Sequence, residues 1–328
     1  MANMNDVAKL AGVSRGTVSN YINGVKVKAV LAERIEVAIK ELNYVPNQSA
    51  RALKKQTSDT VAFILPTIWT PFFAELTHYI QLELQKNNLK MLLCNSNNEF
   101  TLELDYVKMA KEEKVKGIIT ISYSDIEPYI TSNLPIVSIE RYFNQRVPFV
   151  TSDNFQGARL AAHELHKRGS KKFLMILRAL PANLGIYERM NGFIAYCKHE
   201  GLEYEVYMDK GESMGFAQRI ESYIQKEYRN ECPYDGIFAV TDRYAEYVIQ
   251  AFQNLPWKIP EDVQLIGFDG ARSYHQQPLT VSTIAQNIKE IAKVSIEELL
   301  QFDGQKSFQN KHLLPVQFWD LKTTRNLE

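Results

Sequence analysis

The chain has little cysteine and no long apolar run. Its three cysteines, Cys94, Cys197 and Cys232, are far apart and lie in apolar surroundings. This scarcity excludes a disulfide framework, so we expect reduced, buried thiols of the kind found in a cytoplasmic protein. No stretch reaches the ~18–20 apolar residues that cross a membrane. Asp6 and Lys9 interrupt the first apolar residues, so we also expect no signal peptide.

Several enzyme motifs are missing from the sequence. No Gly-x-Gly-x-x-Gly follows a strand-like run, and no phosphate-binding loop ends in Gly-Lys-Ser. The segment from His163 to His166 is one residue short of the zinc-protease spacing, which favours an ordinary solvated helix face. Ser273 and His275 are close in sequence, but nothing indicates that they pair as nucleophile and base. We therefore predict that the protein is not an enzyme and has neither a cofactor nor a metal site.

The chain also lacks net charge, but its charges are unevenly distributed. The 38 basic residues balance the 38 acidic ones. Residues 1–56, however, contain nine Lys or Arg and four Asp or Glu, an excess of five positive charges that the remainder offsets. A basic amino-terminal segment on a mildly acidic body is typical of a nucleic-acid-binding module joined to a domain of another kind.

Residues 4–25 have the pattern of two short helices joined by a sharp turn. Asn5 or Asp6 can cap the first helix, Gly12 suits the turn, and Ser14 can cap a second helix that runs to about Ile22. The outward face of that second helix is small and polar: Arg15, Gly16, Thr17 and Asn20. Such a face suits base edges and phosphates in a major groove, so the pattern predicts a DNA-reading helix-turn-helix. A plain helical hairpin at the start of an enzyme is the alternative.

A third helix is predicted over 31–42, which completes a three-helix headpiece. Pro46 then forces the preceding residue out of helical conformation. Residues 48–55 have helical character but almost no apolar face, so this helix should be marginally stable alone.

From residue 61 the sequence alternates between apolar strands and amphipathic helices. Near-continuous apolar strands joined by helices predict parallel sheets covered on both faces. There are too many such units for one sheet, so we expect two lobes. The predicted strands are 61–66, 90–96, 117–122, 135–140, 149–152, 171–177, 204–208, 236–241 and 263–268, and the predicted helices are near 72–87, 101–113, 155–168, 186–200, 213–229, 243–254 and 286–301.

Ligands of open α/β sheets collect beyond the carboxyl ends of the strands. Hydroxyl, carboxylate and aromatic side chains at those ends suit a polyhydroxylated ligand, because carboxylates accept sugar hydroxyls and rings cover apolar sugar faces. For the three aspartates among them, a role as an ordinary helix N-cap remains the alternative. The candidates are Thr67, Trp69, Ser122, Tyr123, Ser152, Asp153, Thr241, Asp242 and Asp269.

A series of short motifs runs along the whole chain, and in this order and spacing it resembles the LacI/GalR family of bacterial transcription regulators. The motifs are DVAKLAGVSRGTVSNYING at 6–24, Tyr44, Pro46, Asn47 and ARAL at 50–53, PFFAEL at 71–76, SDNFQGARLAAHEL at 152–165, ERMNGF at 188–193, FAVTD at 238–242, IGFD at 266–269 and PLTVSTI at 278–284.

The resemblance implies a fold and its boundaries. We expect a helix-turn-helix headpiece over 1–45, a hinge helix and linker over 46–59, and a two-lobed, periplasmic-binding-protein-like effector domain over 60–328. The first lobe would comprise about 60–157 and 284–312, and the second about 158–283 and 313–328. The chain would cross between lobes near 155–160, 282–286 and 311–316.

The resemblance also implies ligand contacts in the effector domain. Arg189 and Asp269 would be the main anchors, with Asp153 as a further contact. The aromatic pair Phe72 and Phe73 would lie in the cleft. Thr241 stands where the family usually has Asn, which puts its hydrogen bond to ligand in doubt. Trp69 would lie near the cleft and stack on the ligand, with core packing as the competing account.

For DNA, the resemblance assigns base reading to Arg15, Gly16 and Asn20. Gly16 has no side chain to read a base, so Arg15 and Asn20 must supply more or the backbone must approach closely. Leu53 would be the wedge inserted into the minor groove, unless it is an ordinary linker leucine. The remaining expected contacts, some of which set position on the phosphates, are Ser14, Thr17, Ser19, Asn23, Tyr44, Asn47 and Ala50.

The function implied is a homodimeric repressor of a carbohydrate-utilisation operon, bound to a pseudo-palindromic double-stranded operator and controlled by a small sugar-like effector. A nucleobase, nucleoside or sugar phosphate acting as co-repressor is the alternative, and whether the effector induces or co-represses stays open. No leucine heptads follow the last predicted strand, so we expect a dimer rather than a tetramer. Two rivals are a periplasmic-type sugar receptor, which would lack the headpiece, and a sugar-modifying enzyme, which would need a catalytic pair.

Overall fold

The computed structural model describes residues 2–45, 58–130, 134–143, 147–180, 184–302 and 311–327. The chain divides between Ser58 and Asp59 into two compact units, which are considered in turn. The expected hinge helix over 46–59 falls almost wholly outside the described residues.

The first unit contains three helices, α1 (Met4–Ala11), α2 (Arg15–Ile22) and α3 (Ala29–Glu41). The cap of α1 is Asn3 rather than the predicted Asn5 or Asp6. Its side chain accepts from the amides of Asn5 and Asp6, while the Asp6 carboxylate accepts from the Asn3 amide at 2.8 Å. Asp6 is thus the N3 residue of a capping box, in which the N-cap is the residue three positions before it, Asn3.

The turn between α1 and α2 is the one that the sequence predicts. Gly12 has a φ of 64°, which glycine adopts without strain. Ser14 caps α2, and its hydroxyl accepts from the Thr17 amide at 3.1 Å. Apolar side chains from all three helices form one small core: Val7, Ala8, Ala11, Val18, Ile35, Ala38 and Tyr44. The three-helix headpiece is therefore confirmed.

The second unit has two lobes, each built on one six-stranded sheet. In the first lobe the strand order is β2-β1-β3-β4-β5-β11, and all neighbours are parallel. The strands are β1 (Thr60–Leu65), β2 (Lys90–Asn95), β3 (Gly117–Thr120), β4 (Ile136–Ile139), β5 (Phe149–Ser152) and β11 (Lys311–Leu314), and the helices are α5 (Pro71–Lys86), α6 (Phe100–Glu112), η1 (Glu127–Tyr129) and α11 (Ile288–Leu300).

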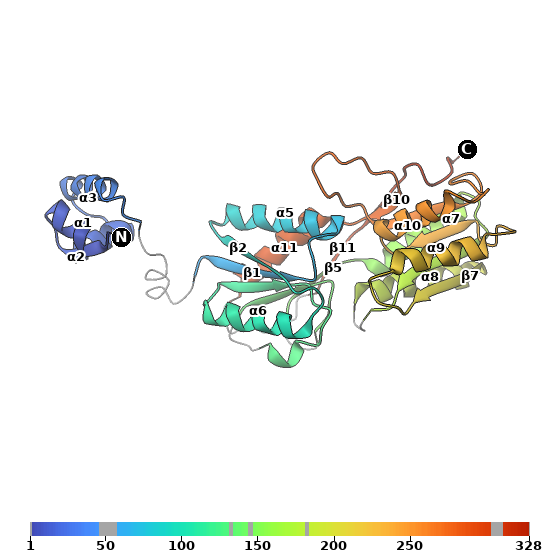
Figure 1. The fold of residues 1–328 in the computed structure, drawn as a ribbon, viewed down its shortest axis with the longest axis horizontal. Helices are drawn as coiled ribbons and strands as arrows, with labels where there is room; N and C mark the ends of the chain where they lie inside the picture. The colour runs from blue at the N-terminus through green and yellow to red at the C-terminus, as the bar shows by residue number, and fades with distance from the viewer. Residues whose placement is uncertain are drawn as a thin grey trace. The chain divides into compact units, whose positions relative to one another are not determined.

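The two faces of this sheet are covered by different helices. Along β1, Phe63 and Leu65 pack with α5 and α11, whereas Ala62 and Ile64 pack with α6 on the other face. Figure 1 shows α5 and α11 on one side of the strands and α6 on the opposite side. This period of two in a nearly fully apolar strand is the signature of a sheet buried on both faces.

The second lobe repeats the architecture with the order β7-β6-β8-β9-β10-β12, parallel except that β12 runs antiparallel to β10. Helices α7 and α8 cover one face, and α9 and α10 cover the other. The strands are β6 (Lys172–Arg178), β7 (Glu203–Asp209), β8 (Gly236–Ala239), β9 (Gln264–Asp269), β10 (Ser282–Ala285) and β12 (Gln317–Trp319), and the helices are α7 (Asn154–Lys167), α8 (Gly185–Glu200), α9 (Phe216–Glu227) and α10 (Asp242–Phe252).

The chain crosses between the lobes three times. The crossings lie after β5 at residue 153, after β10 at 286–287 and after β11 at 315–316. The first lies slightly earlier than the expected 155–160, because β5 ends at Ser152 and α7, which packs in the second lobe, begins at Asn154. The predicted two-lobed α/β fold is confirmed, but β10, β11 and β12 were not among the predicted strands. They are short, and β11 and β12 are partly exposed, which weakens the apolar signal.

None of the described helices is long and apolar enough to cross a membrane.

The three cysteines are free thiols, with Cys94 and Cys197 buried and Cys232 half-buried. Burial raises the pKa of each thiol, to about 11 for Cys94.

Candidate functional site

A cavity of about 260 Å³ lies between the two lobes of the second unit. Residues that follow β1 and β3 line it from the first lobe, and residues that follow β6 and β8 line it from the second. In each sheet these are the two central strands between which the strand order reverses. The cavity therefore lies at the topological switch point of both sheets, where open α/β folds bind their ligands.

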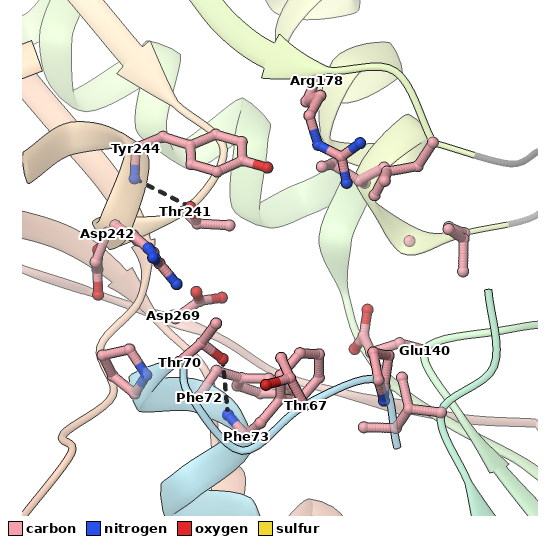
Figure 2. Close-up of a pocket in the computed structure, with 18 of the residues that line it drawn as sticks. Thr67, Thr70, Phe72, Phe73, Glu140, Arg178, Thr241, Asp242, Tyr244 and Asp269 are labelled. Carbon is pink, nitrogen blue, oxygen red and sulfur yellow. Dashed lines mark hydrogen bonds between the residues drawn. The ribbon is translucent and has the colours of Figure 1, made fainter. Parts of the chain in front are cut away.

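Most of the expected effector residues meet in this cavity. Figure 2 shows side chains of the first lobe facing those of the second across it, with Asp269 between them. The expected residues that line it are Thr67, Phe72, Phe73, Tyr123, Arg189, Thr241, Asp242 and Asp269. Their roles toward a ligand stay predictions.

Four of the expected residues do not line the cavity. The side chain of Trp69 is in neither of its expected environments, since the residue is 86% exposed and belongs to neither the cavity nor the core. Asp153 caps α7, accepting from the Gln156 amide at 3.0 Å, and borders a separate cavity of about 480 Å³. For Asp153 the N-cap alternative is thus the one the structure favours. Ser122 and Ser152 are buried and lie outside the first cavity.

Arg189 is held rigidly in the floor of the cavity. Its Nε donates to Asn154 Oδ1 at 2.7 Å and its Nη1 donates to the Val240 carbonyl at 2.6 Å. The guanidinium group lies 3.6 Å from the centroid of the Phe268 ring, and Nη1 lies 3.5 Å from Asp269 Oδ1. With only 5% of the residue exposed, this charge is fixed in place before any ligand arrives.

Two carboxylates close together are buried beside Arg189. Burial raises the pKa of Asp269 to about 6, although the charge of Arg189 and a 2.8 Å hydrogen bond from Gln286 oppose the rise. Burial and the charge of Asp269 raise the pKa of Asp242 well above its ordinary value. Asp242 Oδ2 accepts from the Gly270 amide at 2.8 Å. Because Gly270 directly follows Asp269, this hydrogen bond links Asp242 to the backbone next to the other acid. The pair therefore tends to keep a proton.

Asp269 and Thr241 show how the local backbone shapes the site. Asp269 has a φ of 122°, a backbone conformation that residues other than glycine rarely adopt. Thr241 is the N-cap of α10, and its hydroxyl accepts from the Tyr244 amide at 3.2 Å. That hydroxyl is thus already engaged as an acceptor, which leaves its proton for a ligand oxygen.

Sequence reasoning missed several polar residues of the cavity, among them Glu140, Arg178, Tyr244 and Gln286. Glu140 directly follows β4 and Arg178 ends β6, so reading the ends of every strand would have found both. Gln286 follows β10, a strand that was itself missed. Glu140 accepts from the Thr151 hydroxyl at 2.9 Å and from Asn154 Nδ2 at 3.0 Å.

Three contacts join the second lobe to α5 of the first lobe and the loop before it. Directly after Asp269, Ala271 packs in the core cluster of the first lobe, and the Arg272 amide donates to Glu75 Oε2 at 2.6 Å. At the start of α10, Arg243 Nη1 donates to the Trp69 carbonyl at 3.5 Å. We call residues 270–277 the interlobe strap.

In the headpiece, the expected DNA-contacting residues that the structure describes lie on α2 and at its two caps, Ser14 and Asn23. Tyr44 is the exception, because its ring is only 9% exposed and packs in the headpiece core. Asn47, Ala50 and Leu53 lie outside the described residues. Ser14, Arg15, Gly16, Asn20 and Asn23 are exposed, and Thr17 and Ser19 are half-buried.

No group of three His, Cys, Asp or Glu side chains in the described part of the chain is arranged to hold a metal ion. The residues that line the cavity offer hydrogen-bonding, charged and aromatic side chains. It is suited to recognising a small polar molecule.

The chain matches two family models, one for each unit. A model described as "Bacterial regulatory proteins, lacI family" matches residues 3–47, and one described as "Periplasmic binding protein-like domain" matches residues 162–320. A sucrose operon repressor of Streptococcus mutans is 34% identical over 321 residues, which cover 96% of this chain and 97% of that protein. A ribose operon repressor of Bacillus subtilis is 31% identical and covers 99% of both chains.

A solved structure has the same fold over nearly the whole chain. The lac repressor dimer bound to operator and the anti-inducer ONPF superposes with a TM-score of 0.84 at 20% identity, covering 98% of this chain and 99% of that one. At this identity the likeness concerns the fold alone.

The coupled carboxylates predict a pH-dependent stability. Their native pKa values lie above the ~3.9 of an exposed aspartate. Their contribution to stability is therefore present below about pH 4 and is lost as the pH rises through about 6. We expect Asp242→Asn to raise the free energy of unfolding by about 1–2 kcal/mol at pH 7.5 and to change it little at pH 4.5.

Urea unfolding at the two pH values measures this difference, with Asp105→Asn on an exposed helix face as the matched control. An equal effect of Asp242→Asn at both pH values would contradict the shared proton.

Proposed function

Because the chain belongs to the lacI family of bacterial regulatory proteins, we propose that it is a homodimeric repressor of a carbohydrate-utilisation operon, controlled by a small sugar-like effector. The observation that supports this best is the joint presence of two features. One is a helix-turn-helix headpiece with a polar outward face. The other is a cavity between two lobes with Arg189 and Asp269 in its floor.

The cavity has the chemistry that a sugar requires. Asp269 and Gln286 can accept from hydroxyl groups, and Arg189 can donate to them. Phe72 and Phe73, both buried, offer aromatic surface to the apolar face of a sugar ring. Two relatives named as sucrose and ribose operon repressors agree with a carbohydrate effector. Because no covalent chemistry is called for, we propose a binding protein rather than an enzyme.

On the DNA side, we propose that α2 enters the major groove. Arg15 and Asn20 would read base edges, and Gly16 would let the backbone approach closely. Ser14, Thr17, Ser19 and Asn23 would set position on the phosphates. Two headpieces of a symmetric dimer would bind two half-sites of a pseudo-palindromic operator. A protein that works on chromosomal DNA would work in the cytoplasm.

The hinge over 46–59 would carry the signal to DNA. We propose that Leu53 is inserted into the minor groove at the operator centre, with Asn47 and Ala50 nearby, when two hinge helices pair. The interlobe strap and the contact of Arg243 with the Trp69 carbonyl supply a path from the cavity to α5. For a ~100-fold change in operator affinity, the effector must favour one arrangement by about 2.7 kcal/mol.

Replacing Asp269 should uncouple DNA binding from the effector. In Asp269→Asn the shape and the tolerance of positive φ are kept, but the charge is lost. We expect effector affinity to fall about 10- to 100-fold, because a hydrogen bond to a charged group contributes about 1.5–3 kcal/mol. Operator affinity without effector should not change. Fluorescence anisotropy of labelled operator, with and without effector, measures both, and Asp262→Asn outside the cavity is the control. A normally responsive Asp269→Asn protein would refute the anchor role.

Binding to operator should depend steeply on salt, and Arg15 should contribute specificity. Each neutralised phosphate adds about −0.9 to the slope of log affinity against log salt. We expect Arg15→Ala to lose about 1–3 kcal/mol on the specific operator and much less on unrelated DNA, as a base contact should. Competition titrations at several salt concentrations test this, with exposed Arg34→Ala on α3 as the comparison. Equal losses on both DNAs would make Arg15 a phosphate contact, and a flat salt response would contradict DNA binding.

A further inference from the structure

We propose that the effector is an anionic carbohydrate, a sugar carrying a phosphate ester or carboxylate group, and that Arg178 binds the charged group. This inference rests on the proposed function and specifies its ligand. It concerns a positive charge in the cavity that forms no ion pair with a carboxylate of the described residues.

Arg178 is the last residue of β6, at the switch point of the second lobe. It is half-buried and lines the cavity. Figure 2 shows its guanidinium group directed into the cavity, on the same side as Tyr244. Burial raises the pKa of Tyr244, and the positive charge of Arg178 opposes that rise, which agrees with their proximity.

The nearest candidate for a counter-ion is already occupied. Asp209 stands opposite Arg178 in the register of β6 and β7. Its carboxylate, however, forms a two-pronged pair with Arg219, with both N–O distances at 2.8 Å. Arg219 therefore lowers the pKa of Asp209 most strongly and uses both of its oxygens, whereas Arg178 contributes a smaller lowering through its charge and no hydrogen bond. A further hydrogen bond from Arg219 to the Met214 carbonyl, at 3.1 Å, holds this pair in place.

Among the residues that the structure describes, no Asp or Glu oxygen lies within 4.0 Å of the Arg178 guanidinium, so no carboxylate forms an ion pair with it. Glu140, across the cavity, already accepts from Thr151, Ser152 and Asn154. Asp269 is engaged by Arg189 and Gln286. Asp242 accepts from the Gly270 amide through Oδ2, and its Oδ1 is buried without a hydrogen-bond partner among the described residues. None of these carboxylates pairs with Arg178, whose side chain interacts with the neutral hydroxyl of Tyr244 instead.

A second arginine adds further positive charge to the cavity. Arg243 lines the cavity, and its described hydrogen bonds go to two neutral oxygens, the Tyr247 hydroxyl at 2.7 Å and the Trp69 carbonyl at 3.5 Å. Holding positive charge in a partly desolvated cleft is unfavourable unless an anion compensates it. Guanidinium groups match the oxygens of phosphate and carboxylate, which they can bind with two parallel hydrogen bonds.

The polar residues that line the cavity fall into two groups by their chemistry. Arg189, Asp269 and Gln286 are suited to hydroxyl groups, and Arg178 with Tyr244 is suited to an anion. A neutral sugar would satisfy the first group and leave Arg178 without a counter-ion. A sugar with an acidic substituent would satisfy both.

Isothermal titration of the full chain with paired ligands tests the inference. The neutral probes are glucose, fructose and ribose; the anionic probes are glucose 6-phosphate, fructose 6-phosphate, ribose 5-phosphate, gluconate and glucuronate, with inorganic phosphate alone as a reference. We expect at least one anionic sugar to bind 10-fold or more tightly than its neutral parent. Preference for the phosphates or for the sugar acids identifies the anionic group.

Variants then assign the preference to Arg178. Arg178→Gln should reduce affinity for the anionic sugar by 10- to 100-fold and leave that for the neutral parent unchanged, whereas Arg178→Lys should retain part of the preference. Exposed Arg229→Gln in the same lobe is the matched control. Thermal unfolding of each variant shows whether the fold is kept, and loss of the preference in a folded Arg178→Gln protein supports the inference.

Three outcomes overturn the inference. If a neutral sugar binds as tightly as its anionic derivative, the inference fails while the proposed function stands. If the preference persists in Arg178→Gln, the charge is bound elsewhere and the assignment to Arg178 fails. If none of the probes binds to a protein that still binds DNA, the carbohydrate effector of the proposed function fails with it.

Discussion

The buried guanidinium of Arg189 is the constraint around which the ligand cavity and the joint between the lobes are built. A charge in this position must be fully compensated, and its partners come from segments far apart in the chain. Asn154 begins α7 directly after the first crossing between the lobes, and Val240 directly follows β8 in the second lobe. Asp269 in turn accepts from Gln286 at the second crossing, whose Oε1 accepts from the Ser152 hydroxyl at 2.6 Å. A ligand that binds Arg189 and Asp269 therefore acts on the same groups that hold the crossings together.

The chain after Asp269 extends this connection to the first lobe. The Gly270 amide donates to Asp242, Ala271 packs in the apolar core of the first lobe, and the Arg272 amide donates to Glu75. The strained φ of Asp269 and the raised pKa values of Asp269 and Asp242 lie at the beginning of this strap. Backbone strain and two neighbouring buried carboxylates raise the free energy of the protein without ligand, and a bound ligand can lower it. Binding at this turn is therefore suited to changing the relative position of the lobes.

The fold was largely predictable because its strands are short, apolar and followed by polar residues, so both the sheets and their ligand-binding ends can be read from the sequence. The errors have definite causes. Trp69 lies on an exposed loop, and its environment depends on how the lobes meet, which no local pattern reports. The phosphate contact expected of Tyr44 stays a prediction, but the sequence did not indicate that its ring packs in the small headpiece core. Arg178 was overlooked because an arginine at a strand end resembles a solvated charge until the pairing of Asp209 with Arg219 is known.

Hydrogen–deuterium exchange on the full chain, with and without a bound effector, tests the central claim that the ligand site and the lobe joint are one network. The amide of Gln286 donates to the Asp269 carbonyl at 2.9 Å, and the amide of Asp153 donates to the Leu314 carbonyl at 2.8 Å, so both report on the crossings. The account predicts that effector slows exchange at the first two crossings and in the strap over 270–277, and changes exchange in α5. Protection confined to the residues that line the cavity, with the crossings and α5 unchanged, would contradict it.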